Sequence, residues 1–109
     1  MIINLSPYLK DKKYVMESSL STVSNYSFND EGITGFLFAI IIGNYYLESY
    51  KYRENMSRTY YYELVCWEES DNFGPEIFRK NNIVKEDLVK VIIDSVFHCE
   101  RLNNLKAFS

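Results

Sequence analysis

The chain has 109 residues, 47% of them hydrophobic and 25% charged, which is the composition of one folded domain of about 100–150 residues. Ten Tyr and seven Phe help raise the aromatic content to 17%, which excludes an intrinsically disordered chain. The net charge is only −3, but residues 30–71 carry eight acids against three bases. Nucleic acids are bound through clustered basic side chains, so this balance argues against a nucleic-acid-binding protein and permits a basic protein partner.

The N-terminal segment predicts a helix. Ser6 is a suitable N-cap, and Pro7 fits the first helical position, where its missing N–H is not needed. Apolar residues from Tyr8 to Val23 follow at a loose helical spacing, although the serine-rich end of this segment weakens the pattern. No long apolar segment of a signal peptide is found here, so we expect a cytoplasmic protein.

The middle of the chain predicts an antiparallel β-meander, which we place from Ile33 to Glu68. Its first segment is continuously apolar, and the next two alternate between the two sides of a strand. Gly43 and Asn44, between the first two segments, favour a type II′ hairpin turn. The three segments are residues 33–42, 45–53 and 59–70.

The apolar run of residues 33–43 is too short for a membrane span. It has 11 residues, whereas a spanning helix needs about 20. We therefore expect this run to belong to the core and the protein to bind no membrane.

The end of the chain predicts the clearest element, an amphipathic helix from Lys85 to about Leu102. Before it, residues 71–82 predict a loop and a short helix that begins near Pro75. The apolar stripe of the C-terminal helix, at spacings of three and four residues, comprises Leu88, Val89, Ile92, Ile93, Val96 and Cys99. The expected fold of residues 1–109 is a single α+β domain, in which a meander of about three or more strands packs against this helix, with a helix at the N-terminus.

The segment TYYYELVCWEES, residues 59–70, has two different faces, because successive side chains of a strand point to opposite sides of its sheet. The expected core face comprises Tyr60, Tyr62, Leu64 and Cys66. The opposite and wetter face comprises Tyr61, Glu63, Val65, Trp67 and Glu69.

The wetter face is our candidate binding site, because it combines aromatic and acidic side chains. Tyr and Trp supply large, stiff contact surfaces, and carboxylates bind Arg or Lys side chains. The alternative interpretation is that Tyr, a strong strand former, merely covers a small sheet. Glu48 joins the acidic patch if the strand register allows it. The residues that we expect to contact a partner are Tyr61, Glu63, Trp67, Glu69 and Asp71.

No catalytic, metal-binding or cofactor-binding site is expected. His98 is the only histidine, and its helical neighbours Asp94 and Arg101 describe a solvated polar face. Cys66 and Cys99 are 33 residues apart without a CxxC pair, so we expect two buried free thiols rather than a zinc site or a redox motif. No glycine pattern of a phosphate-binding loop is present.

Two functions of different classes fit these features. The first is a small acidic protein-binding domain of the kind that bacteria use as immunity proteins or antitoxins. Such a domain neutralises a toxin, for example a nuclease, by covering its basic surface. The second is a small enzyme or ligand-binding domain with a pocket between the sheet and the C-terminal helix. Because no set of convergent polar residues supports the second, we expect protein binding without enzymatic activity.

Overall fold

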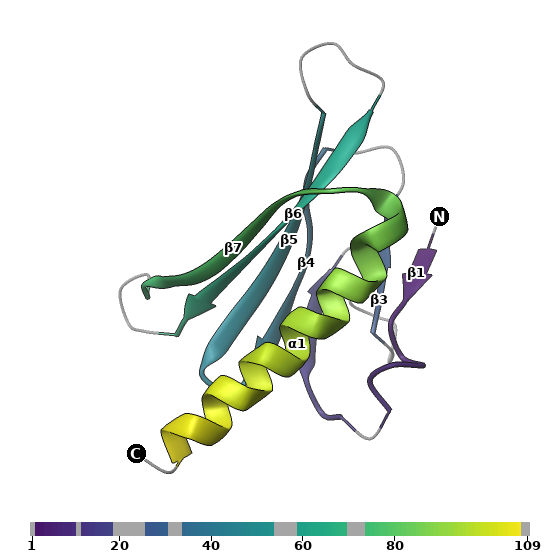
Figure 1. Ribbon diagram of the computed structural model, residues 1–109. Coiled ribbons are helices and arrows are strands. Elements are labelled where there is room, and N and C mark those ends of the chain that lie inside the picture. The colour runs from purple at the N-terminus through teal and green to yellow at the C-terminus, as the bar shows by residue number, and fades with distance from the viewer. Residues whose placement is uncertain are drawn as a thin grey trace.

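The computed structural model describes residues 2–10, 12–18, 26–30, 34–53, 59–69 and 74–107 (Figure 1). These residues form an α+β fold of seven strands and one helix, which confirms the expected fold class. In chain order the elements are β1 (Ile2–Asn4), β2 (Val15–Ser18), β3 (Ser27–Asn29), β4 (Gly35–Ile42), β5 (Tyr45–Arg53), β6 (Tyr60–Glu68), β7 (Glu76–Ile83) and α1 (Lys85–Ala107).

The main sheet has five antiparallel strands in the order β2-β4-β5-β6-β7, and β1 pairs with β3 in a separate small sheet. Figure 1 shows α1 crossing one face of the main sheet, with β1 and β3 at one side. The hydrophobic core lies between this face and α1. Its fully buried side chains include Phe28, Phe38, Ile40, Leu47, Leu64, Ile92 and Val96.

The meander of β4, β5 and β6 confirms the strand prediction for the middle of the chain, although Ile33 lies outside the described residues. The expected turn is present, because Ile42 pairs with Tyr45 across the two residues Gly43 and Asn44. Gly43 has a φ of 60° and Asn44 is not among the residues of positive φ, which is the combination that a type II′ turn requires. The turn therefore forms where its glycine permits this backbone.

Helix α1 secures that turn from the opposite layer. Asn103 donates from Nδ2 to the Ile42 carbonyl at 2.7 Å and accepts at Oδ1 from the Asn44 N–H at 3.1 Å. The helix continues to Ala107, five residues beyond the expected end near Leu102. Within the described part of the chain, no helix is both long and apolar enough to span a membrane.

The N-terminal helix prediction is wrong. Ser6 does not cap a helix, because its hydroxyl accepts a hydrogen bond from the Tyr26 N–H at 3.1 Å. The chain makes short turns between Leu5 and Leu9, whose side chains are buried in the core. Residues 15–18, in the middle of the segment predicted as helix, pair with β4 as a strand. Residues 19–25 lie outside the described part of the chain.

The short helix expected near Pro75 is also wrong, because residues 76–83 form β7 at the sheet edge. Glu76 pairs with Trp67 and Arg79 pairs with Val65, so residues two apart in β6 face residues three apart in β7. This bulge gives β7 a spacing of three, which resembles helical periodicity. The bulge explains why the alternation of a strand is not visible in this part of the sequence.

A buried ion pair joins the end of β3 to β5. Asp30 Oδ1 lies 3.0 Å from Lys51 Nζ without hydrogen-bond alignment, and the Tyr62 hydroxyl donates to Asp30 Oδ2 at 2.7 Å. Lys51 also donates to the Asp30 carbonyl at 2.8 Å. Burial by itself raises the pKa of Asp30, but the Tyr62 hydroxyl and Lys51 together outweigh it and hold that pKa below its ordinary value. Burial and the hydrogen bond to Asp30 raise the pKa of Tyr62.

Candidate functional site

The face of the main sheet opposite α1 is called the open face here, because no helix of the described residues lies over it (Figure 1). The strand register fixes which side chains share this face. One transverse row contains Val15, Ile41, Tyr46, Trp67 and Glu76. The next row contains Glu17, Ala39, Glu48, Val65 and Arg79.

The open face carries a hollow of 670 Å³, which we call the acidic hollow. Ala39 lines it from the middle of the sheet, where a short side chain leaves space between taller neighbours. Its aromatic walls are Phe36, Tyr46, Tyr50 and Trp67. The acidic residues that line it are Glu17, Glu48, Glu68 and Glu69. No basic residue is among the described residues that line it.

Tyrosine hydroxyls orient two of these carboxylates. The Tyr50 hydroxyl donates to Glu48 Oε2 at 2.6 Å, and the Tyr46 hydroxyl donates to Glu69 Oε1 at 3.4 Å. Burial and the hydrogen bond to Glu48 raise the pKa of Tyr50 to about 12. The negative charge of Glu69 is the main cause that raises the pKa of Tyr46. Both hydroxyls therefore stay protonated at neutral pH and act as donors.

The four acids differ in how they are neutralised. Glu68 forms an ion pair with Lys106 of α1. Among the described residues, Glu17, Glu48 and Glu69 form no ion pair with a basic side chain. Three carboxylates around an aromatic hollow therefore carry a negative charge that the described part of the chain leaves uncompensated.

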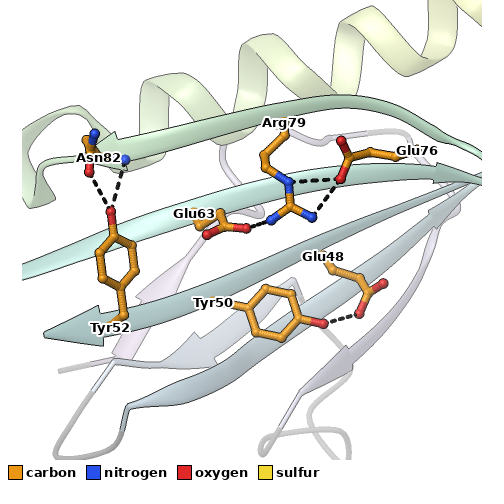
Figure 2. A network of polar contacts seen from close by, with 7 residues as sticks. All are labelled: Glu48, Tyr50, Tyr52, Glu63, Glu76, Arg79 and Asn82. Atoms are coloured by element: carbon orange, nitrogen blue, oxygen red, sulfur yellow. Dashed lines mark hydrogen bonds and ion pairs between the residues drawn. The ribbon is translucent and has the colours of Figure 1, made fainter. Parts of the chain in front are cut away.

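A second hollow of 500 Å³ adjoins the first, and Tyr50 and Trp67 line both. In this second hollow Arg79 forms ion pairs with Glu63 and Glu76, as Figure 2 shows. Arg79 Nε donates to Glu76 at 2.8 Å, and its terminal nitrogen lies 2.6 Å from the same carboxylate oxygen. The charge of this second hollow is thus balanced within the protein.

The predicted faces of β6 are confirmed. Tyr62, Leu64 and Cys66 are buried beneath α1, and Tyr60 at the strand end is 40% exposed. Val65 is on the open face, yet it is only 1% exposed. Its taller neighbours in the adjoining rows account for that burial.

The predicted contact residues are only partly brought together. Trp67 and Glu69 line the acidic hollow, whereas Glu63 is paired with Arg79 in the second hollow. Tyr61 packs against the ring of Tyr52, with centroids 5.9 Å apart. Asp71 lies outside the described residues.

The contact residues predicted from the sequence all belong to residues 61–71, whereas β5 and β4 also line the acidic hollow. Tyr46 and Tyr50 of β5 provide half of the aromatic walls, and Glu48 is the acid between them. The alternation of residues 45–53 puts these three side chains on one face of a strand, so this part of the site could be predicted from the sequence. The exposure of Phe36, which is 52%, could not be predicted, because Phe36 lies within a continuously apolar run that shows no alternation.

The centre of the layer between the sheet and α1 is occupied by buried core side chains. At its edge β7 and α1 line a hollow of 550 Å³ with Phe78, Lys80, Asp94, Phe97, His98 and Arg101. Cys66 and Cys99 are buried in the layer as free thiols, as predicted, with their sulfur atoms 3.5 Å apart. The contact with Cys99, together with burial, raises the pKa of the Cys66 thiol. His98 is half-buried on the polar side of α1, with its ring 5.1 Å from that of Phe78. The described residues contain no group of three or more side chains placed to hold a metal ion.

Comparison with known proteins gave no match. No protein-family model matches the chain. No curated protein and no solved structure matches it either.

Proposed function

We propose that this protein binds a basic protein partner through the open face of its sheet, with the acidic hollow at the centre of the contact. The observation that supports this proposal is the combination of four aromatic walls with three carboxylates that have no basic partner among the described residues. Trp67 and Glu69, both expected from the sequence, belong to this hollow. Glu48 replaces Glu63 as the central acid.

The two kinds of side chain have different effects on binding. Carboxylates at the rim of a contact attract a basic partner over a distance and increase the association rate, an effect that salt weakens. Aromatic side chains provide most of the affinity when the partner buries them, and each such anchor contributes about 2 kcal/mol or more. The open face offers both kinds within one surface.

For the class of partner we propose a toxin, with a nuclease as the first candidate. Nuclease active sites are positively charged because they bind phosphate, so an acidic surface can cover them and block substrate. The protein would then act as an immunity protein or antitoxin in the cytoplasm and would need no catalysis of its own.

The experiment compares partner capture by matched variants. Tagged wild-type protein and the double variant Glu48→Gln/Glu69→Gln are used to capture partners from the native host. The control is Asp94→Asn, which removes one exposed carboxylate on the polar side of α1. We expect a basic partner that the wild type and the control retain and that the double variant loses.

The captured partner is then purified and tested directly. For a nuclease we expect wild-type protein to inhibit its activity at a stoichiometric ratio and the double variant to require a much higher concentration. Thermal melts of all variants, recorded first, show that each is folded. Equal capture by the wild type and by a folded double variant would refute the proposal that the open face is the binding surface.

A further inference from the structure

The acidic hollow retains hydrogen-bond acceptors that the protein itself does not use. Glu48 accepts the Tyr50 hydroxyl at Oε2, and Glu69 accepts the Tyr46 hydroxyl at Oε1. The other oxygen of each carboxylate has no hydrogen-bond donor among the described residues. Two carboxylates with free oxygens, Glu48 held by a short hydrogen bond and Glu69 exposed, therefore line a space with aromatic walls.

At the neighbouring hollow, carboxylates of the same sheet face bind an arginine of the protein itself. This hollow shares Tyr50 and Trp67 with the acidic hollow, and Arg79, which lines it, forms ion pairs with Glu63 of the same lining and with Glu76 beside it (Figure 2). The acidic hollow has the same two aromatic residues and two carboxylates of its own, but no guanidinium from the described chain. The same face of the sheet thus holds one guanidinium between two carboxylates, next to a hollow whose carboxylates have no basic partner among the described residues.

We propose that the acidic hollow binds a single arginine side chain of the basic partner. This inference rests on the proposed function and specifies the chemistry of its central contact. A guanidinium is planar and stacks on aromatic rings, and its five N–H donors form a fork that binds a carboxylate through two parallel hydrogen bonds. A lysine ammonium is a compact, strongly hydrated point charge, which uses flat aromatic walls less well. The hollow therefore selects arginine over lysine.

The dimensions of the hollow allow this occupant. Its volume of 670 Å³ lies within the range of about 300–1,000 Å³ that is usual for small-molecule sites. An extended side chain fits such a space together with part of the peptide that carries it. Because the hollow opens on the sheet surface, the peptide backbone can remain outside.

Trp67 gives a direct readout of occupancy. It is the only tryptophan of the chain and it lines the hollow, so its fluorescence and its single indole N–H resonance report on this space. The probes are three five-residue peptides of glycine and serine with capped ends. Their central residue is arginine, lysine or citrulline, the last being an uncharged analogue of arginine.

We expect the arginine peptide to produce a saturable change in the Trp67 signals. The lysine peptide should bind at least about threefold more weakly, and citrulline should give no saturable change. In Glu48→Gln/Glu69→Gln we expect the affinity for the arginine peptide to fall about tenfold or more, whereas Asp94→Asn should leave it unchanged. A melt of each variant confirms that it is folded before the titration.

Two results would overturn this inference. One is an equal response to the arginine and lysine peptides, which would mean that the hollow responds only to positive charge. The other is the absence of any saturable response to arginine in a folded wild-type protein. If the same carboxylate variants still lose the protein partner, the proposed function stands and only the arginine assignment fails.

Discussion

Replacing Asp30 by Asn tests its ion pair with Lys51, which is the most buried ion pair among the described residues. The carboxylate is 1% exposed and the Lys51 side chain 9%, so water screens neither charge effectively. Asp30→Asn retains the size of the side chain and an oxygen that can accept the Tyr62 hydroxyl. The substitution therefore removes mainly the negative charge that compensates Lys51.

We expect Asp30→Asn to lower the free energy of unfolding by about 3–5 kcal/mol, because removal of one partner leaves a buried charge without compensation. Lys85 adds little to this figure, since its side chain is 51% exposed and lies 3.5 Å from the carboxylate. Tyr62→Phe removes one hydrogen bond to a charged group, which is worth about 1.5–3 kcal/mol. We therefore expect Asp30→Asn to destabilise the protein more than Tyr62→Phe.

Urea unfolding at pH 7 measures these differences, and a double-mutant cycle isolates the pair. Lys51→Met fills the space of the lysine stem without a charge, so the double variant Asp30→Asn/Lys51→Met should be more stable than Asp30→Asn alone. If the free energy of unfolding of Asp30→Asn lies within about 0.5 kcal/mol of that of the wild type, the ion pair is solvated and the reasoning from burial is wrong.

The pH dependence gives an independent check. Because the folded protein lowers the pKa of Asp30, the contribution of its charge to stability is complete above the ordinary aspartate pKa of about 3.9. It is lost as the pH falls further, through the lower pKa of the folded state. We expect the stability difference between wild type and Asp30→Asn to be constant from pH 7 to pH 5 and to shrink below pH 4. A difference that stays constant in acid would contradict this assignment.

Three further predictions concern the fold. Ile92→Ala should cost about 2–5 kcal/mol in urea unfolding, and more than Ile93→Ala, because only Ile92 is fully buried; the opposite order would mean that the helix face is misassigned. Gly43→Ala should cost about 1–2 kcal/mol or more, since φ is 60° and an added Cβ would lie 2.5 Å from the Asn103 side chain; an unchanged melting temperature would argue against this turn. Cys66 and Cys99 should react with a thiol reagent only after unfolding, and rapid reaction of the native protein would show that they are accessible.

The helix α1 and the two faces of β6 could be predicted because their side chains follow one simple period. The apolar stripe centred on Ile92 has helical spacing, and the alternation from Tyr60 to Trp67 has the period of a strand. Both patterns arise from burial on one side of a regular element, so the local sequence contains them.

Elements whose conformation depends on distant partners could not be predicted in this way. The Ser6 hydroxyl accepts from Tyr26, twenty residues away, so its local resemblance to an N-cap is misleading. The bulge in β7 places Glu76 and Arg79 on the same face at a spacing of three. This spacing is the reason that the partner of Glu63 was missed.

The sequence indicated which types of side chain form the candidate site, but not which of them lie together, because that depends on how the strands pair. Alternation shows which side chains of one strand share a face, but the register decides which strands lie side by side. Pairing of Glu48 with both Ala39 and Val65 produces the row in which the acidic hollow forms. The sequence contains the acids and the aromatics of this surface, while the pairing of the strands decides which acids remain uncompensated.

The open face also contributes to stability, and this determines how its function has to be tested. Val65 is 1% exposed although no helix of the described residues lies over it, and its neighbours on the same face account for this burial. Phe36 and Tyr50 pack edge to face with ring centroids 5.9 Å apart, an arrangement that stabilises a sheet surface without any partner. Truncating one of these aromatic residues would therefore weaken the fold and the binding together. Replacing Glu48 and Glu69 by Gln changes the charge and leaves the packing nearly unchanged, so the carboxylates separate recognition from stability where the aromatic residues do not.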